Sequence, residues 1–153
     1  MHKIPREIIS FFQAQGAVIV STIDAHGFPH SSCKGIIEIK EDGFVYLLDL
    51  YHGQTSRFLK ANSHIALTAV DEHKFKGYCL KGVARMVTDT ILAEELLEAW
   101  DVHITSRITQ RLLRNIRGDK GHTGHPEILL PDPKYLIEIE IQEIVDLTPH
   151  HIV

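Results

Sequence analysis

The chain has 153 residues, of which 44% are hydrophobic and 24% are charged, and its formal net charge is −4. This composition is typical of a soluble globular protein, and the length suits one domain over residues 1–153. The acidic balance argues against a nucleic-acid-binding protein, whose surface would carry an excess of basic residues.

The first half of the chain alternates apolar strands with short polar turns. A helix is predicted at residues 5–16, because Pro5 suits a first helical turn and Gly16 suits the end of a helix. Three strands follow, rich in β-branched residues or with alternating polarity, at 17–24, 28–40 and 44–50. Turns of so few residues can only join antiparallel neighbours, so these strands form a meander.

The second half of the chain mixes strands with helices. The predicted elements are a helix at 55–62, strands at 64–71 and 78–89, helices at 88–100 and 105–117, and a last strand at 134–149. Gly82, inside the long strand at 78–89, indicates a bulge or the close approach of another backbone. This order of elements predicts an α+β barrel or sandwich of about six antiparallel strands.

The chain shows no sign of a membrane anchor or of secretion. No apolar run approaches the length of a membrane span, and the N-terminal residues lack the apolar core and cleavage site of a signal peptide. The two cysteines, Cys33 and Cys79, have no CxxC spacing. The simplest interpretation is a cytoplasmic protein with reduced thiols and no membrane partner.

The common catalytic and metal-binding motifs are absent. The sequence contains no GxSxG, HExxH, Walker A or GxGxxG motif. His122 and His125 lie close together in a glycine-rich segment without a companion pair of cysteines. A zinc site needs three or four convergent ligands, so no metal site is predicted.

The stretch LLDLYHGQTSRFLKAN, residues 47–62, passes from an apolar strand into a helix through a polar turn. The hydroxyls of Thr55 and Ser56, the free N–H groups of a helix start and the cation of Arg57 could together bind a phosphate. A hydroxyl at this position could equally serve only as a helix cap. The residues themselves leave both interpretations open.

Several short motifs occur in sequence over about residues 17–88: Asp24-x-x-Gly27-x-Pro29, Cys33-Lys34-Gly35, Gln54-Thr55-Ser56-Arg57, Gly77-Tyr78 and Lys81-Gly82. Their order resembles the pyridoxamine 5′-phosphate oxidase-like family of FMN-binding split β-barrels. The sequence departs from the family pattern in two places. Gln54 and Thr55 stand where many members carry lysine or arginine, and Phe58 stands where many carry asparagine.

The resemblance implies a split β-barrel with helices over its ends and an FMN at the interface of a homodimer. It implies that FMN is bound by Ser32, Cys33, Lys34, Gly35, Leu48, Asp49, Leu50, Gln54, Thr55, Ser56 and Arg57. In this interpretation the residues of the turn bind the phosphate, and the 32–35 segment binds the edge of the flavin ring. Leu48 and Leu50 cover the ring face, together with Trp100 or Tyr78 of the partner chain.

Three functions are compatible with this resemblance. The first is a flavoprotein oxidoreductase of unknown substrate, using a small-molecule electron donor or acceptor, with no catalytic residue identified. A true pyridoxamine phosphate oxidase is not expected, because the arginine-rich substrate motif is missing from the last residues, LTPHHIV. The second is a haem-binding or haem-degrading split barrel, with His122, His125 or His150 as the axial ligand. The third is a non-catalytic flavin carrier or sensor.

Overall fold

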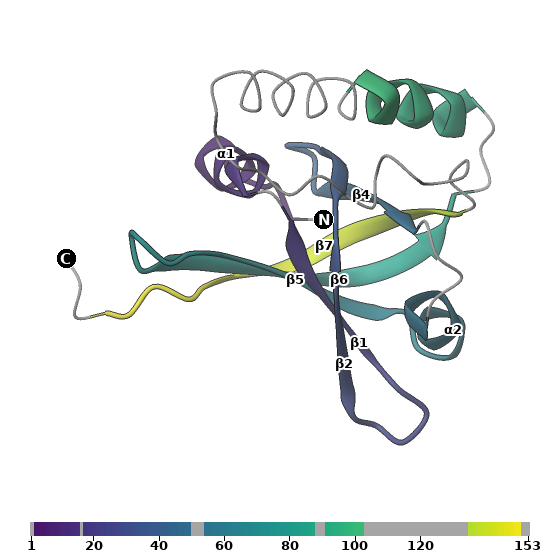
Figure 1. Ribbon diagram of the computed structural model, residues 1–153, viewed down its shortest axis with the longest axis horizontal. Helices are drawn as coiled ribbons and strands as arrows, with labels where there is room; N and C mark the ends of the chain where they lie inside the picture. The colour runs from purple at the N-terminus through teal and green to yellow at the C-terminus, as the bar shows by residue number, and fades with distance from the viewer. Residues whose placement is uncertain (1, 16, 50–53, 88–90, 103–134, 151–153) are drawn as a thin grey trace, which may run out of the picture.

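The computed structural model describes residues 2–15, 17–49, 54–87, 91–102 and 135–150. Its elements in chain order are α1 (Arg6–Ala14), β1 (Val18–Ile23), β2 (Pro29–Lys34), β3 (Ile36–Ile39), β4 (Phe44–Asp49), α2 (Gln54–Ala61), β5 (His64–Asp71), β6 (Lys76–Met86) and β7 (Tyr135–Asp146). Residues 91–102 form a further helix, shown in green in Figure 1. The helix predicted at 105–117 and the glycine-rich segment after it lie outside the described residues.

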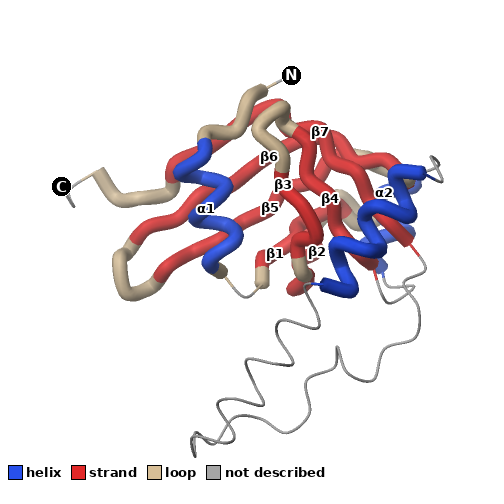
Figure 2. The backbone as a smooth tube through the Cα atoms, turned by 90° about the horizontal axis from the view of Figure 1, so that it is seen from above, coloured by secondary structure: helices blue, strands red, loops and turns tan. Residues whose placement is uncertain are grey.

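All seven strands belong to one antiparallel sheet, in the order β2-β1-β5-β6-β7-β4-β3. Strands β2 and β3 lie at opposite edges of this sheet, yet only Gly35 separates them in the chain. This short link holds the two edges together, so the sheet curls into a half-closed barrel (Figure 2). The prediction of an α+β split β-barrel is therefore confirmed.

The predicted strand over 28–40 is in fact two strands, which raises the number of strands from about six to seven. Before Gly35 the chain pairs with β1, with Cys33 opposite Ile19. After Gly35 it pairs with β4, with Ile36 opposite Leu47. The local sequence does not reveal such a change of partner, because strand pairing depends on residues far apart in the chain.

The barrel interior is filled by alternate side chains of the curled sheet, closed at one end by α1. Val20, Leu67 and Leu80 are completely buried there, and Ile8 and Phe12 of α1 pack against the same cluster. Alternate residues of a strand point to opposite faces, so the intervening residues point to the outside of the barrel.

A second, separate core lies on the outer face of β4 and β7. The helix at 91–102 covers this face (Figure 1). Its buried residues are Tyr46, Leu48, Leu96, Trp100 and Leu136. Because these strands are covered on both faces, four consecutive residues at 136–139 are all buried.

A β-bulge interrupts the regular pairing of β6 with β7. Lys81 pairs with Glu143 while Gly82 pairs with Ile141, which leaves Gln142 as an extra residue in β7. A Cβ atom on Gly82 would lie 2.1 Å from the carbonyl oxygen of Glu140. The predicted bulge and close backbone approach at Gly82 are both confirmed.

Candidate functional site

Strand β2 presents its side chains alternately to the barrel side and to the outside. Ser32 pairs with Val20, which is buried in the barrel, whereas Cys33 pairs with Ile19, which is 44% exposed. Residues directly opposite each other in an antiparallel pair share a face. Ser32 therefore lies on the barrel side with half-buried Lys34, and exposed Cys33 lies on the opposite side.

Helix α2 packs along the barrel side of β2. The hydroxyl of Thr55 is 3.2 Å from that of Ser32, and either group can be the donor. Further along the helix, the ring of Phe58 meets that of His30 edge-on, with 5.2 Å between the centroids. Of the predicted FMN-binding residues, the structure thus brings Ser32 and Thr55 into direct contact.

The structure shows one contact of the Thr55 hydroxyl. Helix α2 is described from Gln54 onwards, so Thr55 lies in its first described turn. The Thr55 side chain is only 2% exposed, and its hydroxyl is directed to Ser32. Arg57 projects from the same turn and is exposed. Leu50 and the side chains of Asp49, Gln54 and Ser56 lie outside the described residues.

The indole of Trp100 covers two residues that were expected to contact the flavin ring. A Cβ atom on Gly35 would lie 3.6 Å from Cζ3 of Trp100, and Leu48 packs in the same buried cluster as the indole. Trp100 itself is 4% exposed. The space next to Gly35 is therefore occupied by a side chain of the same protomer.

The expectation that Trp100 or Tyr78 would be offered to a partner chain is corrected. Trp100 is buried under its own helix, and Tyr78 points into the barrel, where its ring meets Phe11 edge-on at 5.1 Å. Both side chains pack within their own chain. Neither is exposed to cover a flavin ring bound to a second subunit.

A buried carboxylate connects three strands on the outer face of the barrel. The hydroxyl of Tyr46 on β4 donates to Oε2 of Glu138 on β7 at 3.0 Å. The guanidinium of Arg85 on β6 donates to Oε1 of the same carboxylate. Glu138 is only 6% exposed, which is unusual for a glutamate. The sequence carries no local signal for its burial, because the covering helix is distant in the chain.

The same network shifts the titration of Tyr46. Burial, together with the hydrogen bond to Glu138 and the charge of that carboxylate, raises the pKa of Tyr46 to about 12. The ammonium of Lys40 also lies 5.1 Å from the centre of the Tyr46 ring. A phenol with this pKa is protonated at neutral pH, so it can donate a hydrogen bond but cannot act as a base.

This shift predicts a loss of stability in alkaline solution. The pKa of Tyr46 in the folded state lies above its ordinary value of 10.0. The contribution of the protonated Tyr46 to the free energy of unfolding is therefore complete below pH 10 and is lost as the pH rises to about 12. The expected loss is about 2 to 3 kcal/mol over this range. Denaturant unfolding at pH 9, 10, 11 and 12 measures it, and Tyr46→Phe is expected to flatten the pH dependence. An equally steep loss in Tyr46→Phe would contradict the assignment.

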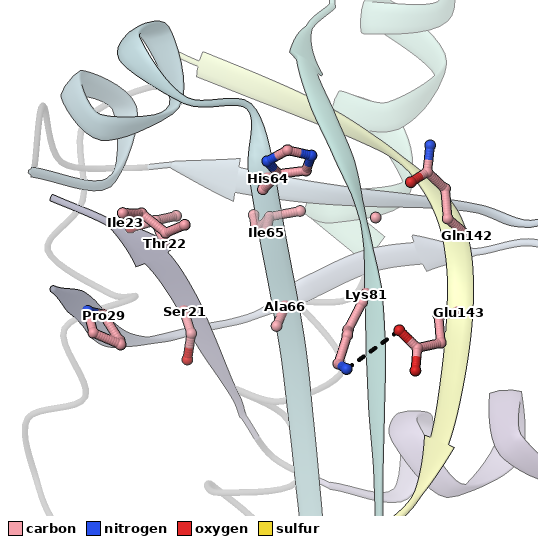
Figure 3. Close-up of a pocket in the computed structure, with 11 residues that line it drawn as sticks. Ser21, Thr22, Ile23, Pro29, His64, Ile65, Ala66, Lys81, Gln142 and Glu143 are labelled. Carbon is pink, nitrogen blue, oxygen red and sulfur yellow. Dashed lines mark hydrogen bonds and ion pairs between the residues drawn. The ribbon is translucent and has the colours of Figure 1, made fainter. Parts of the chain in front are cut away.

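A cavity of about 390 Å³ lies on the outer face of the sheet (Figure 3). It crosses β1, β5, β6 and β7 and is lined by Ser21, Thr22, Ile23, Pro29, His64, Ile65, Ala66, Lys81, Gly82, Gln142 and Glu143. Lys81 and Glu143 lie side by side in its lining, on β6 and β7, with 3.2 Å between Nζ and Oε2. This cavity was not predicted from the sequence. Among its lining residues, only Lys81 and Gly82 belong together to one of the sequence motifs.

The described part of the chain offers neither a metal-binding cluster nor a membrane span. Among its residues, no three His, Cys, Asp or Glu side chains come together as metal ligands. None of its helices is long and apolar enough to cross a bilayer. His122 and His125 lie outside the described residues, and His150 is exposed.

An antiparallel sheet whose two edge strands are joined by one residue, with helices packed against it, defines a split-barrel protein. A family model described as pyridoxamine 5′-phosphate oxidase matches residues 4–144. The chain belongs to that family. Among curated protein sequences, none matches this chain.

Several solved structures have the same fold. HupZ of Group A Streptococcus is 22% identical with a TM-score of 0.67, and the match covers 95% of this chain and 94% of that one. An FMN-binding protein from Syntrophomonas wolfei is 12% identical, with a TM-score of 0.65 and coverage of 94% and 88%. HutZ, the heme storage protein from Vibrio cholerae, is 19% identical, with a TM-score of 0.55 and coverage of 95% and 94%.

Proposed function

We propose that this protein binds FMN and acts as an oxidoreductase on a small molecule, with the FMN phosphate held at the start of α2. The observation that carries the proposal is the contact between the hydroxyls of Ser32 and Thr55, which joins the edge strand to the first turn of a helix. Family membership and the fold shared with an FMN-binding protein support the same conclusion.

The residues around this helix start have distinct roles in the proposed site. While the hydroxyls of Ser32 and Thr55 are bonded to each other, one of the two can still donate to a phosphate oxygen, and the N–H groups of the first turn favour a negative charge. Arg57 supplies the cation in place of the basic residues that many family members carry at Gln54 and Thr55. Bound FMN would supply the electron-transfer chemistry, and Lys34 would stabilise negative charge on the ring edge.

The proposal includes a homodimer with the cofactor at its interface. The outer face of the sheet offers a surface for it, because Ile19, Thr68, Cys79 and Val145 lie side by side on four adjacent strands. Ile19 is 44% exposed in the protomer, and an isologous contact would cover it. Both cysteines are free, which supports a reducing, cytoplasmic location.

Removing the phosphate contacts is expected to weaken FMN binding by about 100-fold, since two charged or hydrogen-bonded contacts to an anion are lost. The variant is Thr55→Ala combined with Arg57→Ala, and the measurement is a titration that follows flavin fluorescence. Thr55→Ser, which keeps the hydroxyl, and Lys60→Ala, at the far end of α2, are expected to bind like the native protein. Unchanged affinity in the double variant would place the phosphate elsewhere.

Two measurements test the wider proposal. Protein that is yellow as isolated and releases FMN supports it, whereas colourless protein that fails to bind added FMN contradicts it. FMN binding without turnover, with reduced nicotinamide nucleotides as donors and common acceptors, would favour a carrier or sensor. A sedimentation experiment tests the homodimer, and a monomer that binds FMN fully would contradict the interface site.

Haem binding is the second candidate function. It is supported by the fold shared with HutZ and by the indole that fills the space expected for a flavin ring. A Soret band in the isolated protein, lost when His122, His125 or His150 is replaced, would favour it over the flavin proposal.

A further inference from the structure

Trp100 packs on the surface where the proposed flavin ring would have to lie. It is the one tryptophan of the chain and is 4% exposed. Its Cζ3 and Cη2 atoms lie 3.6 and 3.9 Å from the position of a Cβ on Gly35. Leu48, the other residue expected against the ring, is 3% exposed in the same cluster.

An isoalloxazine ring and this indole cannot occupy the same surface together. The value of a glycine at a cofactor site is that a flat ring can approach the backbone closely. At Gly35 that approach is already made by the flat indole, in ordinary van der Waals contact. The protomer as it stands therefore does not fit the ring at this surface.

The helix that carries Trp100 packs on a cluster outside the main core. Its buried residues, Leu96 and Trp100, belong to this outer cluster, which is separate from the core inside the barrel. The helix also exposes large apolar side chains at its two ends, with Ile91 69% and Val102 71% exposed. An element outside the main core can open at a lower free energy than the core strands do.

We infer that Trp100 competes with the flavin ring for the surface at Gly35 and Leu48, so that the helix at 91–102 controls access of the ring. The inference rests on the proposed FMN function. In this scheme the phosphate can bind to the closed protomer, and the ring can bind only after the indole has moved. Only molecules in which the indole has moved can bind the ring. The apparent affinity for FMN is then lowered in proportion to the fraction of such molecules.

The first test follows the indole itself while FMN is added. Protein labelled with 5-fluorotryptophan has a single ¹⁹F resonance, because the chain has one tryptophan. We expect FMN binding to shift this resonance and to expose it to a soluble paramagnetic reagent, with the same midpoint as the flavin fluorescence titration. Inorganic phosphate alone is expected to leave the resonance buried. FMN binding with a resonance as protected as before would overturn the inference and leave the FMN proposal intact.

The second test changes the two sides of the contact. Trp100→Leu keeps apolar packing but removes the flat indole, and it is expected to bind FMN at least about tenfold more tightly. Glu98→Ala, an exposed change on the same helix, is expected to leave the affinity unchanged. Equal affinity in Trp100→Leu and the native protein would contradict the competition.

Gly35→Ala is the complementary variant. It leaves the sequence of the helix at 91–102 unchanged, so its result does not depend on how a substitution affects the stability of that helix. Its methyl group would make ordinary contact with the indole, so the protein is expected to fold as before. The same methyl group would hold a flavin ring away from the backbone and weaken FMN binding by about tenfold or more. Full affinity in Gly35→Ala would show that the ring lies elsewhere. Failure of every variant and of the native protein to bind FMN would reject the proposed function and the inference with it.

Discussion

Replacing Gly82 with alanine is expected to destabilise the protein by about 3 to 5 kcal/mol. The new Cβ would lie 2.1 Å from the carbonyl oxygen of Glu140, a backbone atom that cannot rotate away. Strands β6 and β7 would have to separate at their bulge, at the centre of the sheet. Equilibrium unfolding in guanidinium chloride measures the change, with circular dichroism to confirm that the variant folds.

Gly35→Ala is the matched control for this prediction. The substitution is the same, but the nearest atom to the new Cβ belongs to a side chain at 3.6 Å, which is an ordinary contact. Its stability is expected to lie within about 1 kcal/mol of the native value. If the two alanine variants were equally stable, the contact between Gly82 and Glu140 would not be a constraint on the fold.

Replacing Glu138 with alanine is expected to cost about 3 kcal/mol, since a buried hydroxyl then loses its acceptor and a cavity is left. The hydroxyl of Tyr46 would remain under the helix at 91–102 with no carboxylate to accept its hydrogen bond. Arg85 contributes less, because its side chain is 74% exposed and water can replace the lost partner. Thermal and denaturant unfolding both measure the effect.

Glu143→Ala is the comparison variant on the same strand. Its carboxylate pairs with Lys81, but both side chains are at least half exposed, so the expected loss is below about 1 kcal/mol. Tyr46→Phe combined with Glu138→Ala should cost less than the sum of the two single changes, because the unpaired hydroxyl is removed. Additive costs would mean that the hydrogen bond does not contribute to stability.

Much of the fold could be predicted from local patterns. The strand predicted at 64–71 has the same limits in the structure, and the one predicted at 44–50 is a strand over all of its described residues, Phe44–Asp49. Both segments are rich in apolar residues and begin after a polar turn, so the sequence around each is sufficient. The division of 28–40 at Gly35 was missed, because which strand pairs with which depends on residues far apart in the chain.

The candidate site shows where local reasoning stops. The polar turn suggested Thr55 and the family resemblance suggested Ser32, and the hydroxyls of these two residues are in contact in the structure. The alternation of β2 separates Ser32 from Cys33, and this could have been deduced from the two-residue period of a strand. The place of Trp100 over Gly35 could not, since nothing near residue 100 in the sequence specifies the strand that its helix covers.

The position of β7 has a consequence for synthesis of the protein. This strand lies between β6 and β4 in the sheet, but its residues, Tyr135–Asp146, are translated after those of the other six strands. Until they emerge from the ribosome, the nascent chain carries two partial sheets, each with an unpaired edge and an apolar face. The protein is therefore most exposed to aggregation and most dependent on chaperones just before its last strand is available.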